Sequence, residues 1–204
     1  MNKNRIYEIT AGIAFLVATL SYSIGSFIVE SELTKGDFIQ NPSNLISQGL
    51  ILEFVNSIAV IIIGICIHLR FKKQFQKMTF YYLISRILEG VLLALGGILS
   101  IKAYNGSIEI HQMFFNLSML ILGIYSVFFF NHLRRKNIGP SWLMTLGTVG
   151  YLSLAIYSIV NVVGKSQIAP MLLFGPGAIF EIAFPLWLIF KGFKEKEIRY
   201  PASF

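Results

Sequence analysis

The segment SRILEGVLLALGG, residues 85–97, contains Arg86 and Glu89 within a run that is otherwise apolar. The two residues are three positions apart, which places them on the same face of a helix. Glu53 and Glu181 are further acids embedded in apolar segments. A guanidinium and a carboxylate at this spacing can form an ion pair, hold a charged ligand or exchange a proton. Since one arginine cannot neutralise three carboxylates, we expect the surplus acids to be protonated, hydrated or bound to a cation.

The composition indicates the solvent in which these charges are placed. Apolar residues make up 55% of the 204-residue chain, and charged residues make up only 13%. A soluble domain of this length needs more polar surface, because a small globule cannot bury so many apolar side chains. We therefore expect an all-α polytopic membrane protein, a single domain over residues 1–204 that forms a bundle of six transmembrane helices.

Six apolar segments predict the six helices. Their approximate ranges are 6–29, 45–69, 79–101, 109–133, 141–164 and 170–191. The connections are short, except for residues 30–44. In the last segment, Gly175, Pro176 and Gly177 either kink a helix that begins near Pro170 or mark the true start of a shorter helix. A proline kink is the preferred interpretation.

The distribution of lysine and arginine predicts how the helices are oriented. Thirteen of the 17 Lys and Arg residues lie at the two termini and in the segments 70–77 and 134–136, and only three lie at the other helix ends. Cytoplasmic loops carry an excess of these residues, so we expect both termini in the cytoplasm. Because the basic residues lie at helix ends and not on one surface, the net charge of +7 does not indicate a nucleic-acid partner.

The charges of segment 79–101 are costly in a membrane. Each charged residue at the centre of a spanning helix raises the free energy of membrane insertion by about 2.5–3.5 kcal/mol. The apolar residues of the segment lower it by about 4–7 kcal/mol in total, so the two contributions nearly cancel. This helix therefore needs partner helices. Arg86, Glu89, Gly90 and Gly97 share one face, and glycines on that face permit close helix approach. We expect the two charges to point into the bundle.

Other segments place polar residues at similar positions. Glu53 and Asn56 lie three apart in the second segment, and Glu181 lies near the middle of the last one. The predicted ligand-binding residues are Arg86, Glu89, Glu181, Glu53 and Asn56. The alternative is that these residues only hold the helices in register. Interhelical hydrogen bonds in membranes average about 0.6 kcal/mol, so costly groups that are weakly repaid in stability favour a functional role.

The remaining sequence contains no motif for a metal or a nucleotide cofactor. His68, His111 and His132 share no metal-ligand spacing, and each is expected at a membrane interface. The single cysteine, Cys66, excludes an internal disulfide or a cysteine-based metal site. No nucleotide-binding glycine loop and no Gly-x-Ser-x-Gly motif occurs. We therefore expect no cofactor and no metal, and we assign no catalytic residue.

Four stretches carry a resemblance to a known family. They are TAGIAFLVATL, SRILEGVLLALGG, LRRKNIGPSWLMTLGTVGY and IFEIAFPLWLIFKGF, and the match to which they belong covers nearly the whole chain in the same order. The sequence resembles the bacterial domain-of-unknown-function 4386 (DUF4386) family of integral membrane proteins. The resemblance implies a six-span protein of the bacterial inner membrane and brings no established activity. Arg86, Glu89 and Glu181 fall within family-like motifs, whereas Glu53 is inferred from depth and periodicity alone.

Three functions remain open for these residues. We favour the binding of a small polar or amphipathic ligand, or of a proton or cation, around Arg86 and the glutamates, for transport. One alternative is a membrane enzyme that acts on a lipid or isoprenoid, with one acid as proton donor. The other is a non-catalytic accessory or immunity-type protein whose polar core is purely structural. The expected partners are membrane lipids and this small molecule or ion, in the multi-pass setting of a bacterial cell (plasma) membrane.

Overall fold

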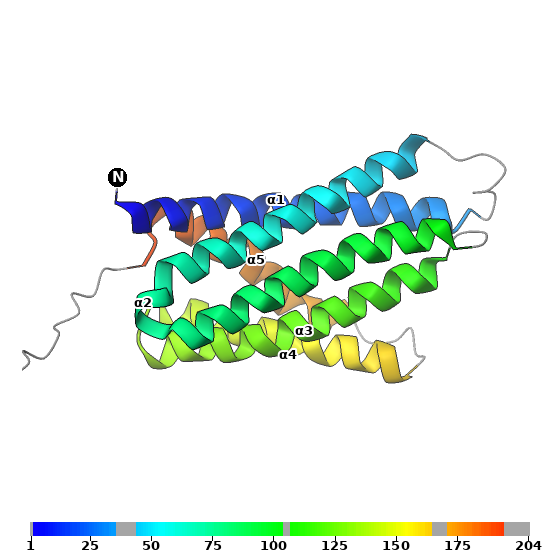
Figure 1. Cartoon of the computed structure of the whole chain (residues 1–204). Helices are drawn as coiled ribbons and strands as arrows, with labels where there is room; N and C mark the ends of the chain where they lie inside the picture. Colours follow the sequence, from blue (N-terminus) through cyan, green and yellow to red (C-terminus); the bar gives the residue numbers. More distant parts are fainter. Residues whose placement is uncertain (1, 36–43, 104–106, 165–170, 194–204) are drawn as a thin grey trace, which may run out of the picture.

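The regular elements of the chain are all helical in the part that the structure describes. This computed structural model describes residues 2–35, 44–103, 107–164 and 171–193. The elements are α1 (Lys3–Leu33), α2 (Asn44–Lys102), α3 (Ile108–Arg135), α4 (Ser141–Gly164), the 3₁₀ turn η1 (Met171–Phe174) and α5 (Gly175–Phe190). Figure 1 shows the long helices running side by side. Four of them, α1 to α4, are long and apolar enough to cross a membrane.

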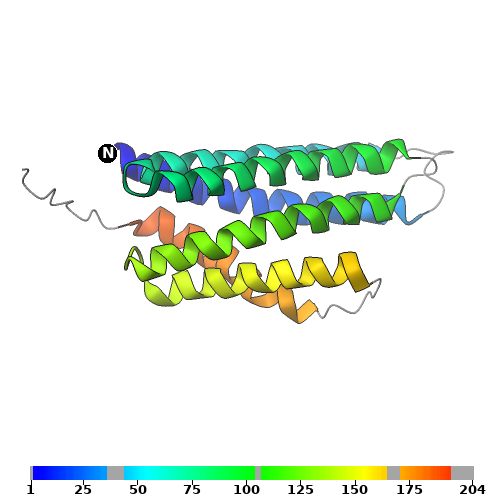
Figure 2. The ribbon, with the colours of Figure 1, turned by 60° about the horizontal axis from the view of Figure 1, so that its bottom comes forward.

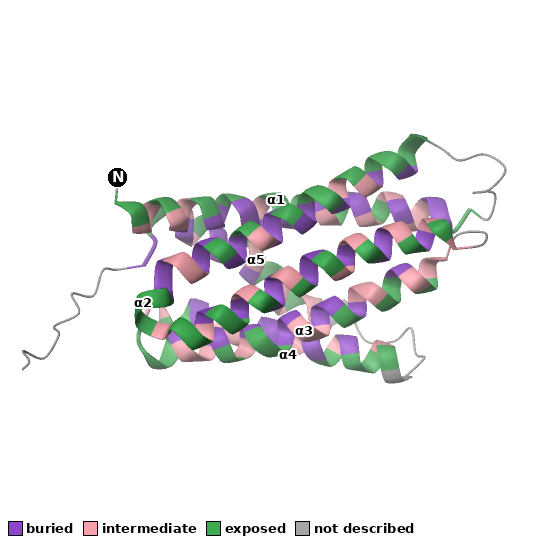
Figure 3. Cartoon of the chain, in the orientation of Figure 1, coloured by how far each residue is buried: buried purple, intermediate pink, exposed green. Residues whose placement is uncertain are grey.

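The outward faces of the helices are apolar. Figure 3 shows exposed and buried residues alternating along each helix, with the buried face turned inward. Large apolar side chains occupy the outward face, among them Phe27, which is 75% exposed, and Leu20, which is 63% exposed. Soluble monomers rarely expose apolar surface on this scale. The arrangement is that of a membrane protein, as the composition predicts.

The second element, α2, is a hairpin. The sequence predicts two helices, 45–69 and 79–101, but helical structure continues through the connection and is broken only at Phe75 (φ −143°, ψ 55°). Figures 1 and 2 show the two arms of α2 lying side by side after this turn. Residues 70–78 contain neither glycine nor proline, so no local signal ends the helix before the chain reverses.

Glycines bring the two arms of α2 into contact. A Cβ atom on Gly64 would lie 2.9 Å from the Cβ of Arg86, and one on Gly90 would lie 2.7 Å from the carbonyl oxygen of Ser57. Both distances are shorter than real Cβ atoms tolerate. Gly90 on the Arg86 face and Gly64 on the facing arm therefore allow a close approach of the two arms, as the sequence predicts for the Arg86 face.

The remaining helices complete the bundle around α2. Helix α1 packs against both arms of α2, α3 packs between α2 and α4, and α5 packs against α1 and α4. Figure 2 shows α5 crossing the bundle obliquely. At one end of α5, a Cβ on Gly12 of α1 would lie 2.8 Å from the Pro185 carbonyl oxygen. At its other end, a Cβ on Gly150 of α4 would lie 2.9 Å from the Cα of Gly177.

The last helix begins at Gly175, so the preferred interpretation of a kinked helix from about residue 170 is wrong. Pro176 lies in the first turn of α5, directly after η1. Proline suits this position because the first N–H groups of a helix have no intrahelical partner. Helix α5 has 16 residues and is therefore about 24 Å long, shorter than the hydrocarbon core of about 30 Å.

A buried ion network joins three helices at the end of the bundle that holds the N-terminus. Glu8, which is 3% exposed, accepts hydrogen bonds from Nε of Arg70 at 2.6 Å and from Nη1 of Arg5 at 3.2 Å. Arg5 also donates to the carbonyl oxygens of Leu188 (2.6 Å) and Ile189 in the last turn of α5. Since these carbonyls lack intrahelical partners, the guanidinium fixes the end of α5 against α1.

Candidate functional site

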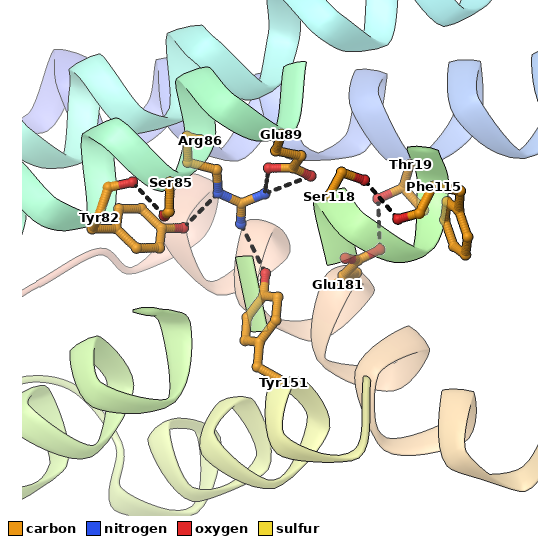
Figure 4. Close-up of polar contacts among 9 residues, drawn as sticks. All are labelled: Thr19, Tyr82, Ser85, Arg86, Glu89, Phe115, Ser118, Tyr151 and Glu181. Carbon is orange, nitrogen blue, oxygen red and sulfur yellow. Dashed lines mark hydrogen bonds and ion pairs between the residues drawn. The ribbon is translucent and has the colours of Figure 1, made fainter. Parts of the chain in front are cut away.

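A buried ion pair lies on the second arm of α2. Nη1 of Arg86 donates to both oxygens of Glu89, at 2.9 Å and 3.3 Å, and the two residues are 2% and 4% exposed. The hydroxyl of Tyr82 accepts from Nε at 3.0 Å, and the hydroxyl of Tyr151, on α4, accepts from Nη2 at 2.8 Å (Figure 4). Every nitrogen of the guanidinium therefore has a partner within the protein.

Aromatic rings surround the same guanidinium. Its Cζ atom lies 5.0 Å from the ring centre of Phe15 on α1, 5.3 Å from that of Tyr82 and 5.9 Å from that of Tyr151. Such cation–π contacts stabilise a desolvated arginine by about 2 kcal/mol when buried. The ion pair is thus held by side chains of α1, α2 and α4, and its charge is compensated inside the protein.

Beside the ion pair lies a cavity of about 550 Å³. Arg86, Glu89, Glu181 and Asn56 line it, and so do hydroxyl groups from the middle of α1. Those hydroxyl residues are Thr19, Tyr22, Ser23 and Ser26. The rest of the lining is apolar. A pocket that is mostly apolar and has a few convergent polar groups is typical of sites for small ligands.

Glu181 is the least compensated acid in this cavity. Its only hydrogen bond among the described residues is accepted from the Thr19 hydroxyl, at 3.4 Å (Figure 4). Its side chain is partly exposed, unlike those of Arg86 and Glu89. Pro185 has no N–H to donate to the Glu181 carbonyl, so the helix is also open at this turn.

Asn56 places an unused donor in the cavity wall. The residue is 3% exposed, and its Nδ2 atom has no hydrogen-bond partner within the described ranges. Buried amide groups in native structures are nearly always paired, and an unpaired one costs about 1–3 kcal/mol. A buried donor in a cavity wall is therefore a point at which a ligand gains a hydrogen bond.

Glu53 lies away from this cavity, in a second polar cluster at the opposite end of the bundle from the N-terminus. Its Oε1 atom is 2.7 Å from Nε2 of His111 on α3, and Nδ1 of His111 is 3.4 Å from Oε1 of Glu30 on α1. Glu53 is 1% exposed and is absent from the described cavity lining. The structure thus brings four of the five predicted residues together and pairs the fifth with a histidine.

Sequence reasoning missed the partners of these charges. Tyr82 precedes Arg86 by four residues, so the i,i+4 spacing on one helix could have found it. Tyr151 and Thr19 carry no such signal. Tyr151 reaches Arg86 only because α4 packs in the same bundle as α2, and Thr19 reaches Glu181 only because α5 packs against α1. The position of His111 near the end of its segment predicts an interfacial residue, whereas its pairing with Glu53 depends on the packing of α3 against α2.

The described residues provide no metal centre. No group of three or more His, Cys, Asp or Glu side chains within the described ranges could hold a metal ion. The groups that the cavity presents to a ligand are hydroxyls, an amide, charged side chains and apolar surface.

A comparison with known families agrees with the resemblance that the sequence motifs carry. A family model described as "Domain of unknown function (DUF4386)" matches residues 10–192, which include every ionisable residue of the cavity. Comparisons with curated proteins and with solved structures find no match. Since the family model covers most of the chain, the protein belongs to the DUF4386 family of membrane-type helical proteins.

Proposed function

We propose that the protein binds a small amphipathic ligand in the cavity between Arg86, Glu89 and Glu181, and that it carries this ligand across the membrane. The observation that supports this most is the cavity of about 550 Å³, in which buried polar groups face an otherwise apolar wall. The volume lies within the range of about 300–1,000 Å³ typical of ligand pockets. A purely structural polar core favours close packing of its polar groups, whereas here Asn56 Nδ2 is left without a partner among the described residues.

The short helix α5 supports a transport role. Its N-terminus lies beside the cavity, because Gly177, Ala178 and Glu181 of its first two turns line it. Shortened helices that begin within the membrane recur at the binding sites of transporters. Movement of α5 relative to α1 would change access to Glu181 without unfolding either helix.

Native mass spectrometry of gently purified protein tests the binding site. The wild type is expected to retain a small molecule, and Ala178→Trp is expected to lose it, because the indole fills the cavity from its exposed rim. Ile179→Trp is the matched control, since Ile179 is 60% exposed and lies one residue away, outside the described lining. An adduct of the same mass and occupancy on all three proteins would contradict the proposed site.

A membrane enzyme acting on a lipid or isoprenoid is the second candidate. The exposure of Ser23, Ala178 and Ile182 at the cavity favours it, since these residues give a lipid chain access from the side. Glu181 would then be the proton donor. Incubation with a lipid extract distinguishes the two functions, because an enzyme returns a bound species of altered mass and a transporter returns it unchanged.

We further propose that the chain crosses a bacterial cell membrane six times, with both termini in the cytoplasm. The spans would be α1, the two arms of α2, α3, α4 and the η1–α5 segment. The basic residues support this orientation, because those near the Phe75 turn, the α3–α4 connection and the end of α5 lie at the same end of the bundle as the N-terminus (Figure 1).

Cysteine labelling tests the orientation. In a Cys66→Ala background, Lys72→Cys is expected to react with a membrane-impermeant maleimide only after the membrane is permeabilised. Lys102→Cys is expected to react in intact cells, because it lies at the end of the second arm of α2, away from the Phe75 turn near which Lys72 lies; both lysines are exposed. The reverse pattern would overturn the orientation.

A further inference from the structure

We propose that the ligand of the cavity is an amphipathic organic cation and that Glu181 is the residue that pairs with its charge. This assignment of ligand class rests on the proposed function, since it concerns the same cavity. It goes further in fixing the sign of the ligand's charge, the residue that recognises it and the side from which it enters.

The first reason is the charge of the described lining. Its ionisable acids and bases are Arg86, Glu89 and Glu181. Arg86 and Glu89 neutralise each other at 2.9 Å, so an ionised Glu181 leaves the cavity with a net charge of −1. Thr19, its hydrogen-bond partner, is neutral. A carboxylate at this depth is stable only when it is protonated or paired with a cation, and a cationic ligand provides that pairing.

The second reason is that Arg86 is not available to an anion. Its Nε, Nη1 and Nη2 atoms already donate to Tyr82, Glu89 and Tyr151, and its charge is already paired with the Glu89 carboxylate (Figure 4). An anionic ligand that paired with Arg86 in place of Glu89 would leave that buried acid without its partner. Removing one partner of a buried ion pair costs about 3–5 kcal/mol. The same ligand would also be repelled by Glu181.

The third reason is the aromatic wall of the cavity. Tyr22, Phe115 and Phe174 all line it. The rings of Tyr22 and Phe115 are stacked with centres 5.6 Å apart, and those of Phe115 and Phe174 are stacked at 6.4 Å. Such rings bind the apolar body of a ligand, and they attract organic cations through the negative charge of their faces. An inorganic ion would gain little from this wall.

The route into the cavity is lateral. Ser23 on α1 and Ala178 and Ile182 on α5 belong to the lining and are also exposed, so they form a rim between the two helices. Ile24 of α1 lies next to this rim and is 52% exposed. An apolar tail can therefore lie between α1 and α5 in the hydrocarbon while the charged group reaches Glu181.

Binding of two probes of the same shape and opposite charge tests this ligand class. The probes are tetraphenylphosphonium, a cation, and tetraphenylborate, an anion, with triphenylphosphine oxide as a neutral probe. Binding is measured by equilibrium dialysis on the full chain in a neutral detergent. The wild type is expected to bind the cation, and Glu181→Gln is expected to weaken that binding about 10-fold or more.

Three variants connect the effect to the charge of Glu181. Glu181→Asp retains the carboxylate and is expected to keep most of the binding, while Glu109→Gln, which changes an exposed acid at the start of α3, is expected to change nothing. Ala178→Trp is expected to abolish binding of the cation. Because the Gln and Asp side chains fit the same space as Glu, both variants should fold, which size-exclusion chromatography checks.

The outcomes separate the ligand class from the proposed function. The neutral probe or tetraphenylborate could bind the wild type as tightly as the cation does, with that binding abolished by Ala178→Trp. In that case the cavity is a ligand site but the assigned ligand class is wrong. Equal cation affinity in Glu181→Gln and the wild type also overturns the class. If no probe shows Ala178-dependent binding and native mass spectrometry finds no adduct, both the ligand class and the proposed function fail.

Discussion

Replacing Arg86 by methionine is expected to lower the midpoint of thermal unfolding in detergent by about 6 °C or more. The substitution leaves the Glu89 carboxylate, which is 4% exposed, without its ion pair. It also removes the donor that the hydroxyls of Tyr82 and Tyr151 share. Breaking a buried pair by removing one partner costs about 3–5 kcal/mol, because an uncompensated charge remains in a buried site.

A double substitution identifies the cause of that loss. Arg86→Met combined with Glu89→Leu removes both charges, and is expected to melt above the Arg86→Met protein, since an apolar pair of similar volume is often as stable as a buried ion pair. The midpoint is followed by size-exclusion chromatography after heating. A double variant that is less stable than Arg86→Met would show that the uncompensated charge is not the source of the instability.

Replacing Gly90 by alanine is expected to separate the two arms of α2 and to destabilise the protein by about 1–3 kcal/mol. The new Cβ would lie 2.7 Å from the carbonyl oxygen of Ser57, 3.2 Å from Ile61 and 3.2 Å from Val60. A backbone atom on the opposite arm cannot turn away as a side chain can, so the arms must move apart. Because Arg86 and Glu89 lie on this arm, the same change is expected to weaken ligand binding.

Gly175→Ala is the matched control for Gly90→Ala. Apart from its chain neighbours and the nearby backbone of its own helix, a Cβ at Gly175 would meet no atom within 4 Å among the described residues. The midpoint is therefore expected to change less than in Gly90→Ala, and the remaining cost comes from Pro176, which disfavours helical backbone for a preceding residue with a Cβ. Thermal melts of both variants are recorded in the same detergent. Similar midpoints for the two would contradict the close packing of the α2 arms.

The part of the site that lies on one helix could be predicted from the sequence. The spacing of Arg86, Glu89 and Gly90 defines a helix face, and the cost of a charge in the membrane directs that face into the bundle. Asn56 follows from the same kind of pattern. These predictions need only the period of a helix and the free energy of burying a charge, both of which are local properties.

The partners of these residues could not be predicted, because they come from helices that are distant in the sequence. Tyr151 reaches Arg86 across 65 residues, and Thr19 reaches Glu181 across 162. The depth of Glu53 in its segment predicts that it lies near the other acids of the interior, and the position of His111 predicts an interfacial residue. In the structure these two residues are partners. Depth along a helix does not determine which neighbouring helix a side chain meets.

The ends of the helices were hard to predict for a different reason. The chain reverses at Phe75 without any glycine or proline, so the hairpin of α2 depends on its tertiary packing. At residues 175–177 the glycine and proline signal was visible but ambiguous, because proline suits both a kink and a first helical turn. The pairing of Glu8 with Arg5 and Arg70 has no local signal, because in the sequence these arginines indicate only the orientation of the helices.

The most direct test of the central claim is an experimental structure of the protein in a lipid nanodisc at a resolution that shows side chains. We expect non-protein density bounded by Glu181, Asn56 and the Arg86–Glu89 pair, with its apolar part directed between α1 and α5. Side chains of α1 or α5 filling that volume, or a guanidinium of Arg86 turned outward to the acyl chains, would contradict it.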